Sequence, residues 1–160
     1  MSDFAIYPVP LSHGTLALSP IPGRGGRFDA DLTALLRWNP DLVLTMTTAA
    51  ELARVGATDL PTRLFESGTN WLHLPIEDFG EPIGETAAYW PQAAAKAHAV
   101  LDKGGKILAH CYGGQGRSGM AIMRLMVERG IKPRDALAQI RKVRPGAVET
   151  KAQEAWASRL

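Results

Sequence analysis

The sequence predicts an α/β fold, with a central and largely parallel sheet that is flanked by helices. Two observations lead to this prediction. Short, continuous apolar runs such as 42–46 (LVLTM) and 106–109 (KILA) are typical of strands buried on both faces, as in a parallel sheet. Longer stretches with apolar residues at helical spacing alternate with these runs along the chain.

The first half of the chain supplies three of the expected strands, at 15–18, 42–46 and 71–75. Gly and Pro gather in 19–26 (SPIPGRGG), which predicts an ordered loop. Acidic residues precede Leu32, Leu35 and Leu36 in 29–38, and this order predicts an amphipathic helix. A short helix is expected at 48–55, around Ala49, Glu51 and Leu52.

The second half has one expected strand, at 106–109, and four expected helices. Pro91 is expected near the first turn of the Ala-rich helix at 86–103, or at its true start. Gly130 is expected to end the apolar helix that precedes it, and Pro133 to begin the next. The four helices are expected at 86–103, 117–129, 133–143 and 150–160.

Size and composition narrow the class of protein. A chain of 160 residues with 46% apolar side chains suits one globular domain, over 1–160. The formal charge of +2 is too small to indicate binding to nucleic acid or to an anionic membrane. No 18-residue apolar run predicts a membrane span. The single cysteine and the absence of a signal-peptide pattern in MSDFAIYPVPLSHG lead us to expect a cytoplasmic protein.

The most informative segment is the loop HCYGGQGRSG, which joins a buried strand to an apolar helix. The strand is expected to end at His110 and the helix to begin near Arg117. Ligands of open α/β sheets bind at the carboxyl ends of the strands, where helix N-termini offer unpaired amides. Gly113, Gly114 and Gly116 allow the backbone to turn successive amides inward as an anion-binding nest.

Cys111 and Arg117 stand at the two ends of this loop. A thiol at a helix N-terminus beside a guanidinium is expected to ionise to the thiolate, which can attack phosphorus. Arg117 offers a planar pair of donors that matches two phosphoryl oxygens. Ser118 is placed to donate to the thiolate when it leaves. The expected phosphate-binding positions are Tyr112, Gly113, Gly114, Gln115, Gly116 and Arg117.

Each of these features also has an ordinary structural explanation. A lone cysteine is often a small buried apolar residue, and a glycine-rich turn is often only a turn. The combination favours chemistry, because arginine and serine follow the cysteine at matching offsets after a buried strand. Two positions stay open: His110 could hold the loop or be plainly structural, and Ser118 could be a simple first-turn residue.

The leaving oxygen of a phosphoester needs a proton, so a carboxylic acid should face the thiolate. The segment HLPIEDFGEP follows an expected strand and offers several carboxylates. Asp78 stands out because Gly80 and Pro82 give it a defined loop, and Glu77 is its neighbour and competitor. Near the C-terminus, Gln153 could orient the attacking water, or could form a helix capping box with Thr150.

These residues resemble the protein tyrosine and dual-specificity phosphatases. HCYGGQGRSG is similar to their HCx5R(S/T) signature, and especially to the kinase-associated phosphatase type, whose loop reads HCYGG-x-GRS. HLPIEDFGEP resembles the acid loop HPI-x-DGG-x-P, and GAVETKAQ resembles GAIQT-x-x-Q. The resemblance implies a three-layer fold, with Cys111 as nucleophile, Arg117 as phosphate clamp and Asp78 as acid and then base. It selects Asp78 over Glu77, supports Gln153, and implies no metal or cofactor.

The predicted function is therefore hydrolysis of phosphotyrosine, phosphoserine or phosphothreonine in proteins, through a phosphocysteine intermediate. The expected partners are a phosphoprotein substrate and, in the loop, phosphate, sulfate or vanadate. Two alternatives remain: a small-molecule or lipid phosphatase of the same mechanism, and a non-catalytic relative that only binds phosphate. The loop between Cys111 and Arg117 contains no charged residue, which argues against a polyphosphorylated lipid. Phe79 replaces a glycine of the resembling acid loop.

Overall fold

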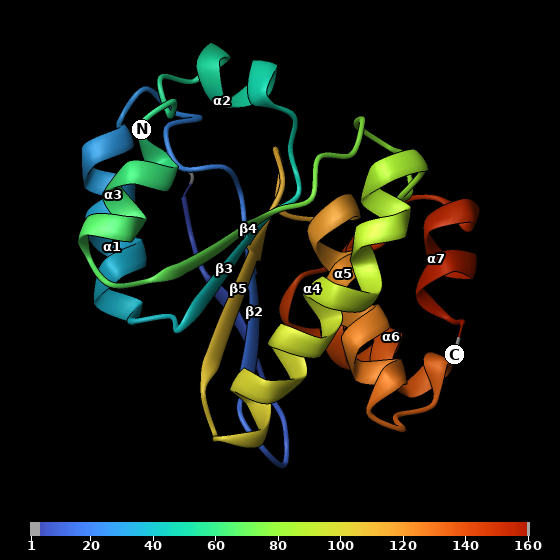
Figure 1. The fold of residues 1–160 in the computed structure, drawn as a ribbon. Helices are drawn as coiled ribbons and strands as arrows, with labels where there is room; N and C mark the ends of the chain where they lie inside the picture. The colour runs from blue at the N-terminus through green and yellow to red at the C-terminus, as the bar shows by residue number, and fades with distance from the viewer. Residues whose placement is uncertain (1–3, 160) are drawn as a thin grey trace.

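A computed structural model describes residues 4–159, and its sheet has five strands. Figure 1 shows this sheet between two layers of helices. The strand order is β1-β2-β5-β3-β4, and every neighbouring pair except β1 and β2 is parallel. The predicted α/β fold with a largely parallel sheet is confirmed. The strands are β1 (Tyr7–Pro10), β2 (Thr15–Ser19), β3 (Leu42–Thr45), β4 (Asn70–His73) and β5 (Lys106–His110).

The antiparallel strand β1 is absent from the sequence-based prediction. Pro8 and Pro10 occupy half of its positions, and a proline cannot donate a hydrogen bond to a neighbouring strand. They are accommodated because β1 is an edge strand that pairs with β2 alone. At an edge, the missing N–H groups can point away from the sheet.

Two helical layers cover the sheet because successive side chains of its central strands are apolar and point to opposite faces. In β5, Ile107 and Ala109 join the larger apolar cluster, whereas Leu108 joins the smaller one on the other face. The larger layer contains α4 (Gly84–Asp102), α5 (Gly116–Glu128), α6 (Pro133–Val143) and α7 (Lys151–Ala157). The smaller layer contains α1 (Phe28–Trp38), α2 (Ala49–Arg54) and α3 (Leu60–Glu66).

Two helices differ from the prediction. α3 was not anticipated, although Pro61 stands in its first turn, where proline is well tolerated. α4 begins at Gly84, so Pro91 lies inside the helix rather than near its first turn. An interior proline has no N–H for the helical ladder. The neighbouring Trp90, which is buried in the larger cluster, holds this stretch by packing.

The parallel strands bring four loops together at the carboxyl ends of the sheet. β5 ends at His110, directly before the 111–117 segment, and its neighbours β2 and β3 end beside it, at Ser19 and Thr45. β4 leads into the loop that contains Asp78. Among the described residues, no helix is long and apolar enough to cross a membrane.

Candidate active site

The 111–117 segment follows β5 and runs into the first turn of α5. Gly114 has a φ of 74°, and a Cβ at this position would come within 2.5 Å of the backbone of Ser19 and Pro20 at the end of β2. Glycine is therefore needed here for both its backbone conformation and its lack of a side chain.

Three carbonyl groups of this segment are hydrogen-bonded to residues outside it. Ile21 N–H donates to the Tyr112 carbonyl at 3.1 Å. Arg144 donates to the Gly113 carbonyl at 2.9 Å and to the Gly114 carbonyl at 3.2 Å. In a planar trans peptide, the N–H points opposite to the C=O. The amides that follow these carbonyls therefore point to the inner side, as an anion nest requires.

Cys111 lies at the base of the segment and is 3% exposed. Its Sγ is 3.2 Å from the Oγ of Ser118, within hydrogen-bonding distance for sulfur. Ser118 is fully buried in the first turn of α5, where it cannot exchange this partner for water. The sequence analysis placed Ser118 where it could donate to the Cys111 thiolate, and the two side chains are in contact in the structure.

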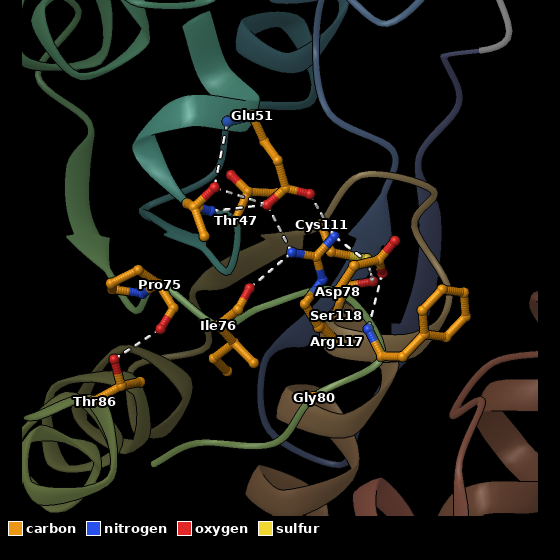
Figure 2. A network of polar contacts seen from close by, with 12 residues as sticks. Thr47, Glu51, Pro75, Ile76, Asp78, Gly80, Thr86, Cys111, Arg117 and Ser118 are labelled. Atoms are coloured by element: carbon orange, nitrogen blue, oxygen red, sulfur yellow. Dashed lines mark hydrogen bonds and ion pairs between the residues drawn. The ribbon is translucent and has the colours of Figure 1, made fainter. Parts of the chain in front are cut away.

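Arg117 is almost completely buried, with 1% of its surface exposed. Its guanidinium donates from Nη1 and Nη2 to the two carboxylate oxygens of Glu51, at 2.8 Å each, and from Nη1 to the Ile76 carbonyl at 2.8 Å. Figure 2 shows it between Glu51 and Asp78, whose Oδ1 is 3.2 Å from Nη2. Within residues 4–159 its Nε–H finds no hydrogen-bond partner, so one buried donor is left for a ligand.

Arg117 and Glu51 each stabilise the charged form of the other. Burial acts to lower the pKa of Arg117, but the Glu51 hydrogen bonds and the negative charges of Cys111, Glu51 and Asp78 raise it overall. Burial likewise acts to raise the pKa of Glu51, yet the hydrogen bonds from Arg117 and from the Thr48 backbone lower it overall. Both side chains therefore stay ionised at neutral pH.

Glu51 was named in the sequence only as part of a short helix, and its role in the site was missed. It also closes a capping box at the start of α2, since its carboxylate accepts from Thr48 N–H at 2.9 Å and Thr48 Oγ1 accepts from Glu51 N–H at 3.3 Å. The pattern T-x-x-E reveals the cap. It does not reveal that the same carboxylate reaches an arginine 66 positions further along the chain.

His110 is fully buried beneath the segment. Its Nε2 is 2.8 Å from the Oγ1 of Thr45, which in turn accepts a hydrogen bond from the indole N–H of Trp71 at 2.7 Å. Burial lowers the pKa of His110 to about 4. A neutral His110 thus links the end of β5 to β3 and β4.

Asp78 and Glu77 point to different places. Asp78 contacts Arg117 and lines a cleft of about 340 Å³ together with Tyr112, Gly113 and Gln115. Glu77 lines a separate cleft beside Pro75 and Ile83. Asp78 is 53% exposed and accepts a hydrogen bond from Phe79 N–H at 3.0 Å. The acid loop therefore brings Asp78, and not Glu77, to Arg117.

Phe79 and Gln153 shape the acid loop from two sides. Phe79 has a φ of 63°, a left-handed conformation that suits the glycine it replaces better than a side chain, and is 59% exposed. Gln153 is fully buried and donates from Nε2 to the Gly80 carbonyl at 3.0 Å. Its Oε1 accepts from Thr150 N–H, so the predicted capping box is present. A water-orienting role for Gln153 stays a prediction.

Arg144 and Glu149 also line this cleft and were not anticipated. The sequence holds only a weak signal for Arg144, in the turn VRPG that precedes the last helix. Within residues 4–159, no group of three or more His, Cys, Asp or Glu side chains gathers as metal ligands would.

Comparison with known proteins relates this geometry to one kind of enzyme. A family model described as the DSP-PTPase phosphatase domain of Swiss Army Knife proteins matches residues 23–157. Mouse protein tyrosine phosphatase type IVA 3 is 29% identical, over 73% of this chain and 72% of its own. Mouse cyclin-dependent kinase inhibitor 3 is 32% identical, over 68% of this chain and 51% of its own.

A solved structure shares the architecture. The kinase-associated phosphatase whose catalytic cysteine is replaced by serine superposes with a TM-score of 0.84 and 25% identity, over 98% of this chain and 93% of that chain. The resemblance found in the sequence motifs is therefore confirmed for nearly the whole length of the chain.

Proposed function

This chain belongs to the cysteine-dependent protein tyrosine and dual-specificity phosphatase family, and on that premise we propose that it hydrolyses phosphomonoesters of proteins through a phosphocysteine intermediate. The observation that carries the proposal is the buried Arg117, whose Nε–H finds no partner within residues 4–159 and whose charge is stabilised by that of Cys111 at the other end of the loop. A buried, ionised guanidinium with a spare donor is suited to an oxyanion, as are the inward amides of the loop.

In the proposed first step, the Cys111 thiolate attacks phosphorus, so that the P–S bond forms as the P–O bond to the leaving group breaks. Asp78, as a carboxylic acid, gives its proton to the leaving oxygen. It now contacts Arg117 Nη2, and it must turn toward the leaving oxygen in this step. Arg117 and the loop amides stabilise the charge on the equatorial oxygens.

In the proposed second step, water attacks phosphorus, the P–S bond breaks, and Asp78 takes the proton of the water. Ser118 is 3.2 Å from Cys111 Sγ and can donate to the departing thiolate. Gln153 is fully engaged in holding the Gly80 carbonyl and the α7 N-terminus, so we propose that it acts on the water through the position of the acid loop. The mechanism uses a free thiol, which suits a cytoplasmic location.

The experiment that tests the function is a substrate panel in the presence of a chelator. We expect metal-independent hydrolysis of phosphotyrosine, phosphoserine or phosphothreonine peptides, with inhibition by vanadate. Preferential hydrolysis of inositol phosphates or nucleotides would instead support the small-molecule alternative. Binding of phosphopeptides without any phosphate release would support the non-catalytic alternative.

Replacing Asp78 by asparagine should slow hydrolysis most for substrates with poor leaving groups. Asparagine keeps the shape of the side chain but has no proton to give, and a positioned acid contributes roughly 100-fold or more to such steps. The check is a series of aryl phosphates of increasing leaving-group pKa, compared between the wild-type protein and the variant.

The matched control for Asp78→Asn is Glu77→Gln, because Glu77 is exposed in the same loop but lines the other cleft. The control should leave the leaving-group dependence unchanged. If the control, and not Asp78→Asn, makes the rates depend on the leaving group, then Glu77 is the acid.

A further inference from the structure

Val148 has a backbone conformation that is costly for its side chain. Its φ is 62°, in the left-handed region that β-branched residues rarely adopt. Neighbours hold it from two sides: Val148 N–H donates to the Gln115 carbonyl at 3.1 Å, and Arg141 Nη2 donates to the Val148 carbonyl at 2.9 Å. Such strain persists only where the surroundings impose it. Here it ties the start of the last helix directly to the phosphate-binding loop.

This tie places the next residue, Glu149, against the loop. Glu149 N–H donates to Gln153 Oε1 at 2.9 Å, which anchors its backbone. Its carboxylate lies so close to Gly116 that a Cβ on that glycine would collide with Oε1. The Gly116 backbone amide acts to lower the pKa of Glu149, as an N–H group close to a carboxylate does. The Glu149 carboxylate thus lies against the last residue before Arg117, within the anion nest itself.

The charges that face Glu149 come from several elements. Burial raises its pKa, the charge of Asp78 raises it further, and Arg117 and the Gly116 amide oppose the rise. Arg24, Tyr112 and Arg144 line the same cleft. The Cys111 thiolate at the base of the loop would add a further negative charge.

We propose that the Glu149 carboxylate is a built-in competitor of the phosphoryl group, which weakens the binding of oxyanions to the loop and makes that binding weaker as the pH rises. The inference rests on the proposed function, because it takes the loop to be the phosphate site. An incoming oxyanion needs the Gly116 amide and the positive charge of Arg117. Glu149 draws on both of these, and its own charge repels a second anion.

The sign of the pH effect follows from the charge of Glu149. Its pKa is raised above the ordinary value of 4.5, so the neutral form persists to higher pH than for an exposed glutamate. At low pH the neutral acid neither repels the oxyanion nor holds the amide strongly. As the pH rises through the pKa of Glu149, its negative charge forms and oxyanion affinity falls.

The test measures sulfate binding by calorimetry, because sulfate remains a dianion and is not turned over. Cys111→Ser serves as the background, since it removes the ionisation of the thiol. Adding Glu149→Gln should tighten sulfate binding roughly threefold to tenfold near neutral pH, as expected for an exposed carboxylate beside a dianion. Over roughly pH 5 to 8, affinity should fall in the background protein and change clearly less in the double variant.

The matched control is Cys111→Ser with Glu154→Gln, which neutralises an exposed glutamate of α7, the helix that follows Glu149, and should match the background protein. Unchanged or weaker sulfate binding with Glu149→Gln would overturn the inference, as would a lack of sulfate binding in every variant. Because sulfate binding needs no turnover, this test can succeed even where the proposed catalysis fails. A protein that binds sulfate as expected but hydrolyses no phosphoester would retain this inference and lose the proposed function.

Discussion

Replacing Cys111 by serine is expected to abolish phosphoester hydrolysis, with a loss of at least about 10⁴-fold in kcat. The proposed reaction depends on a thiolate that forms and breaks a bond to phosphorus. A serine hydroxyl is a far weaker nucleophile unless a base takes its proton, and the neighbour of Sγ is another hydroxyl, that of Ser118. The measurement is the steady-state turnover of an aryl phosphate by both proteins.

The serine variant should still fold and bind oxyanions, because the exchange changes only one buried atom. Retained sulfate binding and equal thermal stability in the variant would show that the loss is chemical. The chain contains a single cysteine, so alkylation by iodoacetate reports on Cys111 alone and should inactivate the wild-type protein in step with labelling. Turnover that survives either treatment would exclude the phosphocysteine route.

Replacing Glu51 by alanine is expected to destabilise the protein by about 3–5 kcal/mol, because it leaves the buried Arg117 charge without its main partner. Glu51 is 7% exposed and Arg117 is 1% exposed, so water cannot replace the lost contacts. The change should also reduce kcat roughly 100-fold, since the guanidinium loses the two hydrogen bonds that aim it. Chemical denaturation and steady-state kinetics measure the two effects.

The control separates this ion pair from the helix cap, to which Glu51 also belongs. Thr48→Ala removes the hydroxyl that accepts from Glu51 N–H and donates to Glu51 Oε2 at 3.2 Å, but it leaves both hydrogen bonds from Arg117 to the carboxylate in place. It should cost about 1 kcal/mol, as a lost N-cap does, and leave kcat nearly unchanged. If the two variants are equally stable and equally active, the carboxylate serves only the cap, and Glu51 does not position Arg117.

The secondary structure could be predicted only in part, and three prolines show why. Pro8 and Pro10 argue against a strand in sequence, but the edge position of β1 leaves their missing donors without consequence. Pro91 argues for a helix start, but Trp90 packs into the larger apolar cluster and the helix runs through. In each case a local preference was overridden by a tertiary position that no local pattern encodes.

Local sequence likewise predicted some parts of the candidate site and not others. Local sequence determined the segment from His110 to Ser118, because a buried strand, a glycine-rich turn and a helix start must follow one another there, and the short turn brings its two ends together. It also determined the acid loop, in which the family resemblance selected Asp78 over Glu77, and the structure adds that the two carboxylates line different clefts.

The tertiary structure alone decided what surrounds the Cys111 loop. Glu51, Arg144 and Glu149 come from distant parts of the chain, and each reaches the site through a side chain whose direction depends on the packing of whole elements. Short-range pattern determines which backbone groups and side chains a turn presents. Which charges face them is determined by packing between elements far apart in sequence. That packing leaves Arg117 buried and ionised, with its Nε–H unpartnered among the residues that the structure describes.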